Sequence, residues 1–136
     1  MDIAVIKPVS EGLPVEILHP ATGEPLGVSV KVRSAEEKIV KDVARAYIDK
    51  QQKLKLRGKD LTVDDYQMWR IKTLQAVIIN WTWAKDTSWN GKKPDPDLEM
   101  LTELVENATW FAEQIEDVAK DSTAFFIDSK ATSSAP

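Results

Sequence analysis

The sequence predicts an α+β fold that is predominantly α: an N-terminal β-hairpin followed by a small bundle of about four helices. Two observations indicate this class. Before residue 34, apolar and polar residues alternate with a period of two, which is typical of strands with one buried face. After residue 34, apolar positions recur at helical spacing for about 90 residues. With 136 residues, the chain has the length of a single domain.

The N-terminal part contains the predicted strands. Residues 13–18 and 26–32 form the clearer pair, because Leu26, Val28, Val30 and Val32 occupy one face of the second strand. Between the two strands, residues 20–23 (Pro-Ala-Thr-Gly) match a type I turn whose last position accepts a positive φ. A further short edge strand is predicted at residues 3–6.

Two helices are predicted after the hairpin. Ser34 and Glu37 have the spacing of a capping box, and the helix that they open is expected to end at Gly58. Asp60 or Thr62 caps the next helix, which is expected to run to about Trp83. Apolar residues surround most of this helix, which predicts the central position in a bundle.

The C-terminal part predicts two more helices. Asp95 is expected to cap the first of them, with Pro96 at its first position. A break is expected near Asn107 or Thr109, and Phe125, Phe126 and Ile127 close the domain. We therefore interpret residues 1–127 as one domain. Residues 128–136 are interpreted as a flexible tail, because they contain too few apolar side chains to pack.

The composition argues against most kinds of catalysis. There is no Cys and only one His, His19, which lies at the predicted turn. No glycine-rich phosphate loop occurs, and helix caps or solvated faces explain the paired carboxylates. We therefore predict that the protein is not an enzyme and has no cofactor and no metal site. No apolar stretch is long enough for a membrane span, and residues 1–12 do not resemble a signal peptide. These features predict an intracellular protein.

The charges are distributed unevenly around the net value of −4. Residues 31–59 contain ten Lys or Arg against four Asp or Glu, whereas residues 97–128 contain nine acids and one Lys. Such blocks are compatible with solvated helix faces, or with complementary ends that pair between copies of the protein. The basic segment lacks interleaved aromatic residues, which argues against nucleic-acid binding.

Aromatic residues are the better indication of function. Trp is enriched at binding hot spots because it buries a large rigid surface and keeps one hydrogen-bond donor. On a helix, Trp81 and Trp83 would lie about 200° apart and would not share one core. Core positions are expected for Trp69, Trp81 and Phe111, and partial exposure for Trp83 or Trp89. The predicted partner-binding residues are Trp81, Trp83, Trp89, Trp110, Phe125 and Phe126.

The order of these features resembles the tail assembly chaperones of long-tailed bacteriophages. The resemblance lies in the hairpin sequence HPATGEPLGVSVKV, in VIINWTWAKDTSWNG, and in PDPDLEMLTELVENATWFAEQI with the later Phe pair. In that family a Trp ends the central helix, a short polar loop with Gly follows, and then come an L-x-x-L helix, an aromatic residue, a Gln-Ile pair and a closing Phe. The match covers most of residues 13–127 in order.

The resemblance implies a mostly helical, self-associating protein of the host cell cytoplasm. Such a protein coats the tape measure protein during tail assembly and is absent from the finished virion. The resemblance also implies that the tail tube protein displaces it, and that a frameshift-extended form recruits the tube subunit. The competing interpretation is a structural minor tail or connector protein, which would stay in purified particles. A nucleic-acid-binding regulator is a third interpretation, and its binding would collapse with salt.

Overall fold

The computed structural model describes residues 2–6, 11–121 and 124–126. The elements are η1 (Ile3–Val5), β1 (Leu13–Leu18), β2 (Pro25–Val32), α1 (Lys38–Leu56), α2 (Val63–Val77), β3 (Ile78–Trp83), α3 (Leu98–Asn107) and α4 (Thr109–Lys120). This arrangement confirms the α+β class. Ile127 and the predicted tail, residues 128–136, lie outside the described residues.

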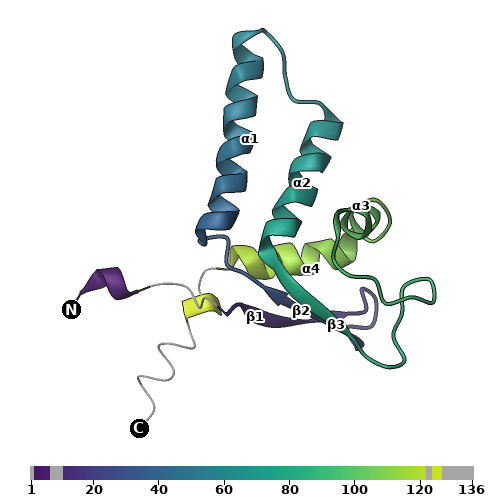
Figure 1. The fold of residues 1–136 in the computed structure, drawn as a ribbon. Helices are drawn as coiled ribbons and strands as arrows, with labels where there is room; N and C mark the ends of the chain where they lie inside the picture. Colours follow the sequence, from purple (N-terminus) through teal and green to yellow (C-terminus); the bar gives the residue numbers. More distant parts are fainter. Residues whose placement is uncertain (1, 7–10, 122–123, 127–136) are drawn as a thin grey trace.

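The strands form one antiparallel sheet in the order β1-β2-β3, with β2 in the centre (Figure 1). The predicted hairpin is confirmed, because Val15 lies opposite Val30 across β1 and β2. Val28, Val30 and Val32 are all buried, as the alternation predicts. The chain turns where expected, and Gly23 has the expected positive φ of +74. Its N–H donates to the carbonyl of His19 at 2.9 Å, so the turn is one residue wider than the predicted type I turn over residues 20–23.

The prediction of one long second helix is wrong. α2 ends at Val77, and β3 begins at Ile78 with no turn between them. In β3, Trp81 lies opposite Val30 of the central strand. A sheet of two strands alone is marginally stable in water. A third strand of β-branched and aromatic residues forms hydrogen bonds with the backbone N–H and C=O groups at the open edge of β2. Pairing with β2 therefore overrides the helical pattern that continues into this segment.

Three smaller predictions at element starts are also wrong. Residues 3–5 form a 3₁₀ turn instead of an edge strand, because the side chain of Asp2 accepts a hydrogen bond from the N–H of Ala4 at 3.1 Å. The Ser34 hydroxyl caps a turn at Glu36 (3.1 Å) instead of a helix, and α1 begins only at Lys38. α3 is capped by Asp97, whose side chain accepts from the N–H of Met100 at 2.8 Å, and not by Asp95.

Other helix boundaries agree with the sequence. Thr62 and Asp65 form a complete capping box at the start of α2. At the end of α1, the N–H groups of Gly58 and Lys59 bond back to the last turn of the helix, at Lys55 and Leu54. α3 and α4 are separated at residue 108, between the two predicted break points.

The helices occupy two regions. α4 packs on β1 and β2, and α3 packs on α2 and α4. α1 and α2 form an antiparallel hairpin whose far end projects away from the sheet (Figure 1). The core lies between the sheet and the helices at the base of this projection. Its fully buried side chains are Ile17, Val28, Val30, Val32, Leu74, Val77, Leu101, Leu104, Ile115 and Phe125.

Candidate partner-binding surface

The structure distributes the six predicted binding residues between the core and half-buried positions. Trp81 is 7% exposed and Phe125 is completely buried. Trp83, Trp89, Trp110 and Phe126 are half-buried, in agreement with the expectation for Trp83 and Trp89. The binding role of all six stays a prediction, since burial alone does not test it.

Trp81 and Trp83 lie on the same face, contrary to the argument made for a helix. In a strand, residues two positions apart point to one side, and the two rings meet edge to face with centroids 5.7 Å apart. Both indole Nε1–H groups donate to the carbonyl of Pro94, at 2.8 and 3.1 Å. The pair thus ties the loop before α3 to the sheet.

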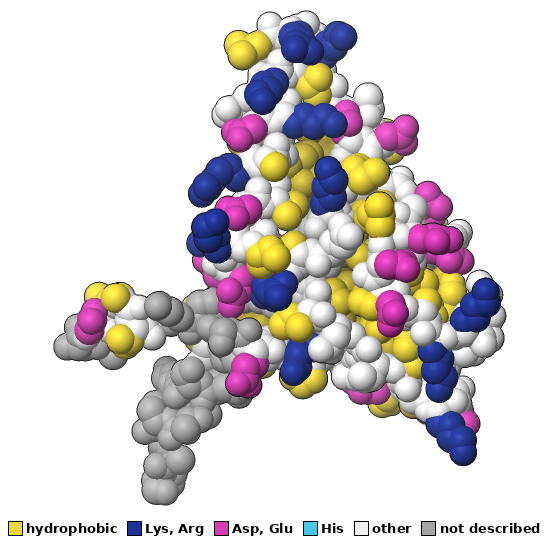
Figure 2. Space-filling view, in the orientation of Figure 1, with side chains coloured by type: hydrophobic (Ala, Val, Ile, Leu, Met, Phe, Trp, Pro, Cys, Tyr) yellow, Lys and Arg dark blue, Asp and Glu magenta, His cyan; other side chains and the backbone are white. Residues whose placement is uncertain are grey.

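A separate surface with exposed apolar side chains lies on the α1–α2 hairpin. Between its helices is a groove of about 310 Å³, which we call the hairpin groove. Figure 2 shows hydrophobic side chains gathered between the two helices, with Lys and Arg along α1. The apolar lining residues are Val43, Ala46, Tyr47, Met68 and Trp69.

The charged lining residues of the hairpin groove carry both signs: Asp42, Lys50, Asp65 and Lys72. Among the apolar lining residues, Met68 is 47% exposed. Two of the apolar lining residues are aromatic, Tyr47 and Trp69, and the centroids of their rings lie 4.6 Å apart. An apolar floor with mixed charges at its edge is suited to the apolar face of an amphipathic helix.

A second, smaller cavity of about 200 Å³ lies at the base of the hairpin, among α1, α2 and α4. Trp69 lines both hollows. Its Nε1–H is buried and has no acceptor among the described residues, and the same is true of Trp89. Most buried donors find an acceptor. Within the described part of the chain, the Trp69 N–H is therefore an unsatisfied donor between the two hollows.

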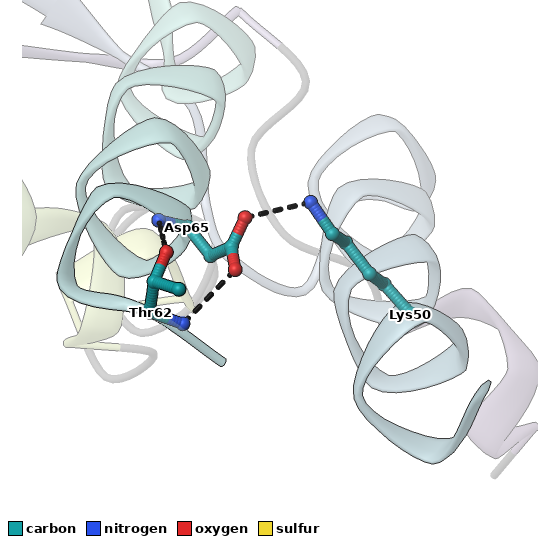
Figure 3. Close-up of polar contacts among 3 residues, drawn as sticks. All are labelled: Lys50, Thr62 and Asp65. Atoms are coloured by element: carbon teal, nitrogen blue, oxygen red, sulfur yellow. Dashed lines mark hydrogen bonds and ion pairs between the residues drawn. The ribbon is translucent and has the colours of Figure 1, made fainter. Parts of the chain in front are cut away.

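An ion pair between Lys50 and Asp65 joins α1 to α2 at the hairpin groove. Figure 3 shows Asp65 bridging the two helices: one carboxylate oxygen accepts from Lys50 Nζ at 2.8 Å, and the other from the N–H of Thr62 at 2.9 Å. The Thr62 hydroxyl accepts from the Asp65 N–H at 3.1 Å. The hydrogen bond from Lys50, followed by those at Thr62, lowers the pKa of Asp65 to about 2.

A second ion pair fixes the base of the hairpin. Arg70 of α2 donates from Nε and Nη2 to both oxygens of Glu116 on α4, at 2.8 and 2.7 Å. Such paired hydrogen bonds are the strong form of this contact. The hydrogen bond to Glu116 raises the pKa of Arg70 above its usual value. The two pairs hold α1 against α2, and α2 against α4.

Sequence reasoning missed the hairpin groove. Apolar residues around most of the second predicted helix indicate a central position in a bundle, whereas Met68 of α2 lines an open groove together with Val43 and Tyr47 of α1. One signal was present in the sequence: a helix that is apolar over most of its circumference packs against several neighbours, and α2 does contact α1, α3 and α4. That signal does not show which of these contacts leaves an open groove.

The side chain of His19 lies at the turn between β1 and β2. His19 Nδ1 accepts from the N–H groups of Ala21 and Thr22, at 3.0 and 3.2 Å, which gives His19 a role in the turn. No three His, Cys, Asp or Glu side chains within residues 2–6, 11–121 and 124–126 are grouped so that they could hold a metal ion. No helix in the same residues has both the length and the apolar character of a membrane span.

Comparison of the chain with models of protein families, with curated proteins and with solved structures finds no match in any of the three.

Proposed function

We propose that this chain is a tail assembly chaperone of a long-tailed bacteriophage. In this role it binds the tape measure protein in the host cell cytoplasm, keeps it soluble during tail morphogenesis, and leaves before the virion is complete. The proposal rests on the sequence resemblance and on one structural observation, the apolar groove of the projecting α1–α2 hairpin. It includes no catalytic step, no nucleic acid and no membrane.

The hairpin groove supports this role through its shape and lining. Two antiparallel helices present a hollow in which a third helix can pack its apolar stripe. The hairpin projects away from the sheet (Figure 1), which favours access by a long partner helix. A tape measure protein is a long helical chain with much apolar surface, and covering such a surface prevents aggregation.

Release of the partner is part of the same proposal. The groove is small, and each charge at its edge is exposed or half-buried, which favours a moderate affinity. The tail tube protein then displaces the chaperone from the tape measure protein. A frameshift-extended form would bring the tube protein to this site.

The decisive experiment is coexpression with the tape measure protein, followed by its quantification in the soluble fraction. We expect the wild-type chain to keep it soluble. Ala46→Glu with Met68→Glu places two carboxylates at exposed positions of the groove, and should lower the soluble yield about tenfold. The matched control, Gln52→Glu with Gln75→Glu, adds the same charge at exposed helix positions outside the groove and should behave as wild type.

Other outcomes of this experiment assign the surface differently. If Trp83→Ala or Trp89→Ala abolishes solubilisation and the groove variant does not, the predicted C-terminal aromatic residues form the interface. If no variant lowers the soluble yield, the interface lies on another surface, and if the wild-type chain does not keep the tape measure protein soluble, the proposal is wrong. Retention of the chain in purified particles would instead identify a structural minor tail or connector protein.

A further inference from the structure

The free end of the α1–α2 hairpin is strongly basic. Lys53, Lys55, Arg57 and Lys59 are exposed, and none of them forms an ion pair with another described residue. Leu56 lies among them with 88% of its surface exposed. We call residues 53–59 the basic tip. Four unpaired cations around an exposed leucine form a surface with no partner within the described residues.

A second groove, of about 450 Å³, runs between α2 and α3. Its apolar lining comes from Val63, Tyr66 and Val105, of which Val63 is 80% exposed. We call it the α2–α3 groove. It differs from the hairpin groove, which lies between α1 and α2.

The α2–α3 groove continues into an acidic surface of α3. Leu98 there is 48% exposed and shares a shallow hollow with Glu99, Glu103 and Glu106. Figure 2 shows acidic side chains gathered over α3 and basic ones at the free end of the hairpin. The two surfaces are therefore opposite in charge, and each contains exposed apolar side chains.

The basic tip and the acids of α3 do not meet within one copy, because the free end of the hairpin points away from α3 (Figure 1). We infer that the basic tip of one copy docks in the α2–α3 groove of a second copy. Leu56 supplies the apolar contact, and the cations of the tip face the carboxylates of α3. Ala46 and Met68, the two residues that are changed to test the proposed tape measure site, take no part in this contact. The inference therefore does not depend on the proposed function.

Sedimentation velocity with reversed charges tests the inference. Lys53→Glu, Lys55→Glu and Arg57→Glu together reverse the charge of the tip, and Glu103→Lys with Glu106→Lys reverses the groove edge. Each of these two variants alone should self-associate at least about tenfold more weakly than wild type at low salt. An equimolar mixture of the two should regain association, because each acidic tip then meets a basic groove. Lys85→Glu with Lys92→Glu, a reversal of charge in the loop after β3, should leave association unchanged.

Salt and the apolar contact provide a second test. Wild-type association should weaken as salt rises from 0.1 M to 1 M, where charges are screened within about 3 Å. Leu56→Ser should weaken it at both concentrations, and because Leu56 is 88% exposed the fold should be unaffected. The inference is overturned if the wild-type protein is monomeric at low salt, if the reversed variants associate as wild type, or if their mixture stays dissociated. Thermal unfolding close to that of wild type shows that each variant is folded.

Discussion

At the scale of single residues, the indole N–H groups separate the tryptophans into two kinds. Trp81 and Trp83 both donate to the carbonyl of Pro94, whereas Trp69 and Trp89 have buried N–H groups without an acceptor among the described residues. A buried donor that lacks an acceptor loses its hydration without compensation. The two kinds of tryptophan should therefore contribute differently to stability.

Replacing each indole by a benzene ring should show this difference. Trp69→Phe removes an unsatisfied donor, whereas Trp81→Phe removes a hydrogen bond of 2.8 Å in the core. We expect the free energy of unfolding to fall less for Trp69→Phe than for Trp81→Phe, by about 1 kcal/mol. Urea unfolding followed by circular dichroism measures both. Equal losses would mean that the N–H of Trp69 is satisfied in solution.

Gly27 is a second residue whose identity the structure requires. It has φ +88 within β2, and a Cβ atom there would collide with the Thr87 hydroxyl, which donates to the carbonyl of Leu26 at 2.6 Å. Gly27→Ala should lower the free energy of unfolding by about 1–3 kcal/mol. Gly23→Ala is the matched control, since its φ is also positive but a Cβ meets no atom within 4 Å. A larger loss at Gly23 than at Gly27 would contradict this account.

At the scale of elements, the junction between Val77 and Ile78 shows where sequence reasoning stops. The β1–β2 hairpin, the Thr62 cap and the division between α3 and α4 followed from local patterns, because alternation, caps and turn residues mark them directly. The change from α2 to β3 has no such mark. Residues 78–83 fit either structure, and only the free edge of β2, distant in sequence, selects the strand.

The candidate site was harder to predict for the same reason. Tryptophan content directed attention to Trp81 and Trp83, but in a strand these residues share one face and bond to Pro94. The hairpin groove depends on how α1 lies against α2. That geometry is set by contacts such as Lys50 with Asp65, which are 15 positions apart, and no local pattern contains it.

The pair formed by Lys50 and Asp65 predicts an acid-sensitive hairpin. The pKa of Asp65 is lowered to about 2, below the value of about 3.9 for an unfolded chain. Its contribution to stability is therefore present above about pH 4 and is lost as the pH falls toward 2. Asp65→Asn should be less stable than wild type at pH 6, and this difference should disappear near pH 2. Asp64→Asn, at the neighbouring exposed position, should show no such dependence; a constant deficit for Asp65→Asn would refute the prediction.

At the scale of the whole molecule, stability should decrease from the base of the hairpin to its free end. At the base, the Arg33 N–H donates to Val77 at 2.6 Å and the Ala35 N–H to Ala119 at 2.9 Å. Beyond Lys50, α1 contains no buried residue. Amide hydrogen exchange should therefore be slow at Arg33 and Ala35 and at least about tenfold faster in residues 51–56. Exchange in residues 51–56 as slow as that at Arg33 and Ala35 would contradict this prediction.

The direct passage from α2 into β3 has a mechanical consequence. With no loop at Val77 and Ile78, α2 has no joint about which it can swing without disturbing the sheet. A force that displaces the α1–α2 hairpin should therefore also displace β3, the strand that carries Trp81 and Trp83. The fluorescence emission of these two residues should change when the α1–α2 hairpin is displaced, although neither ring lines the hairpin groove.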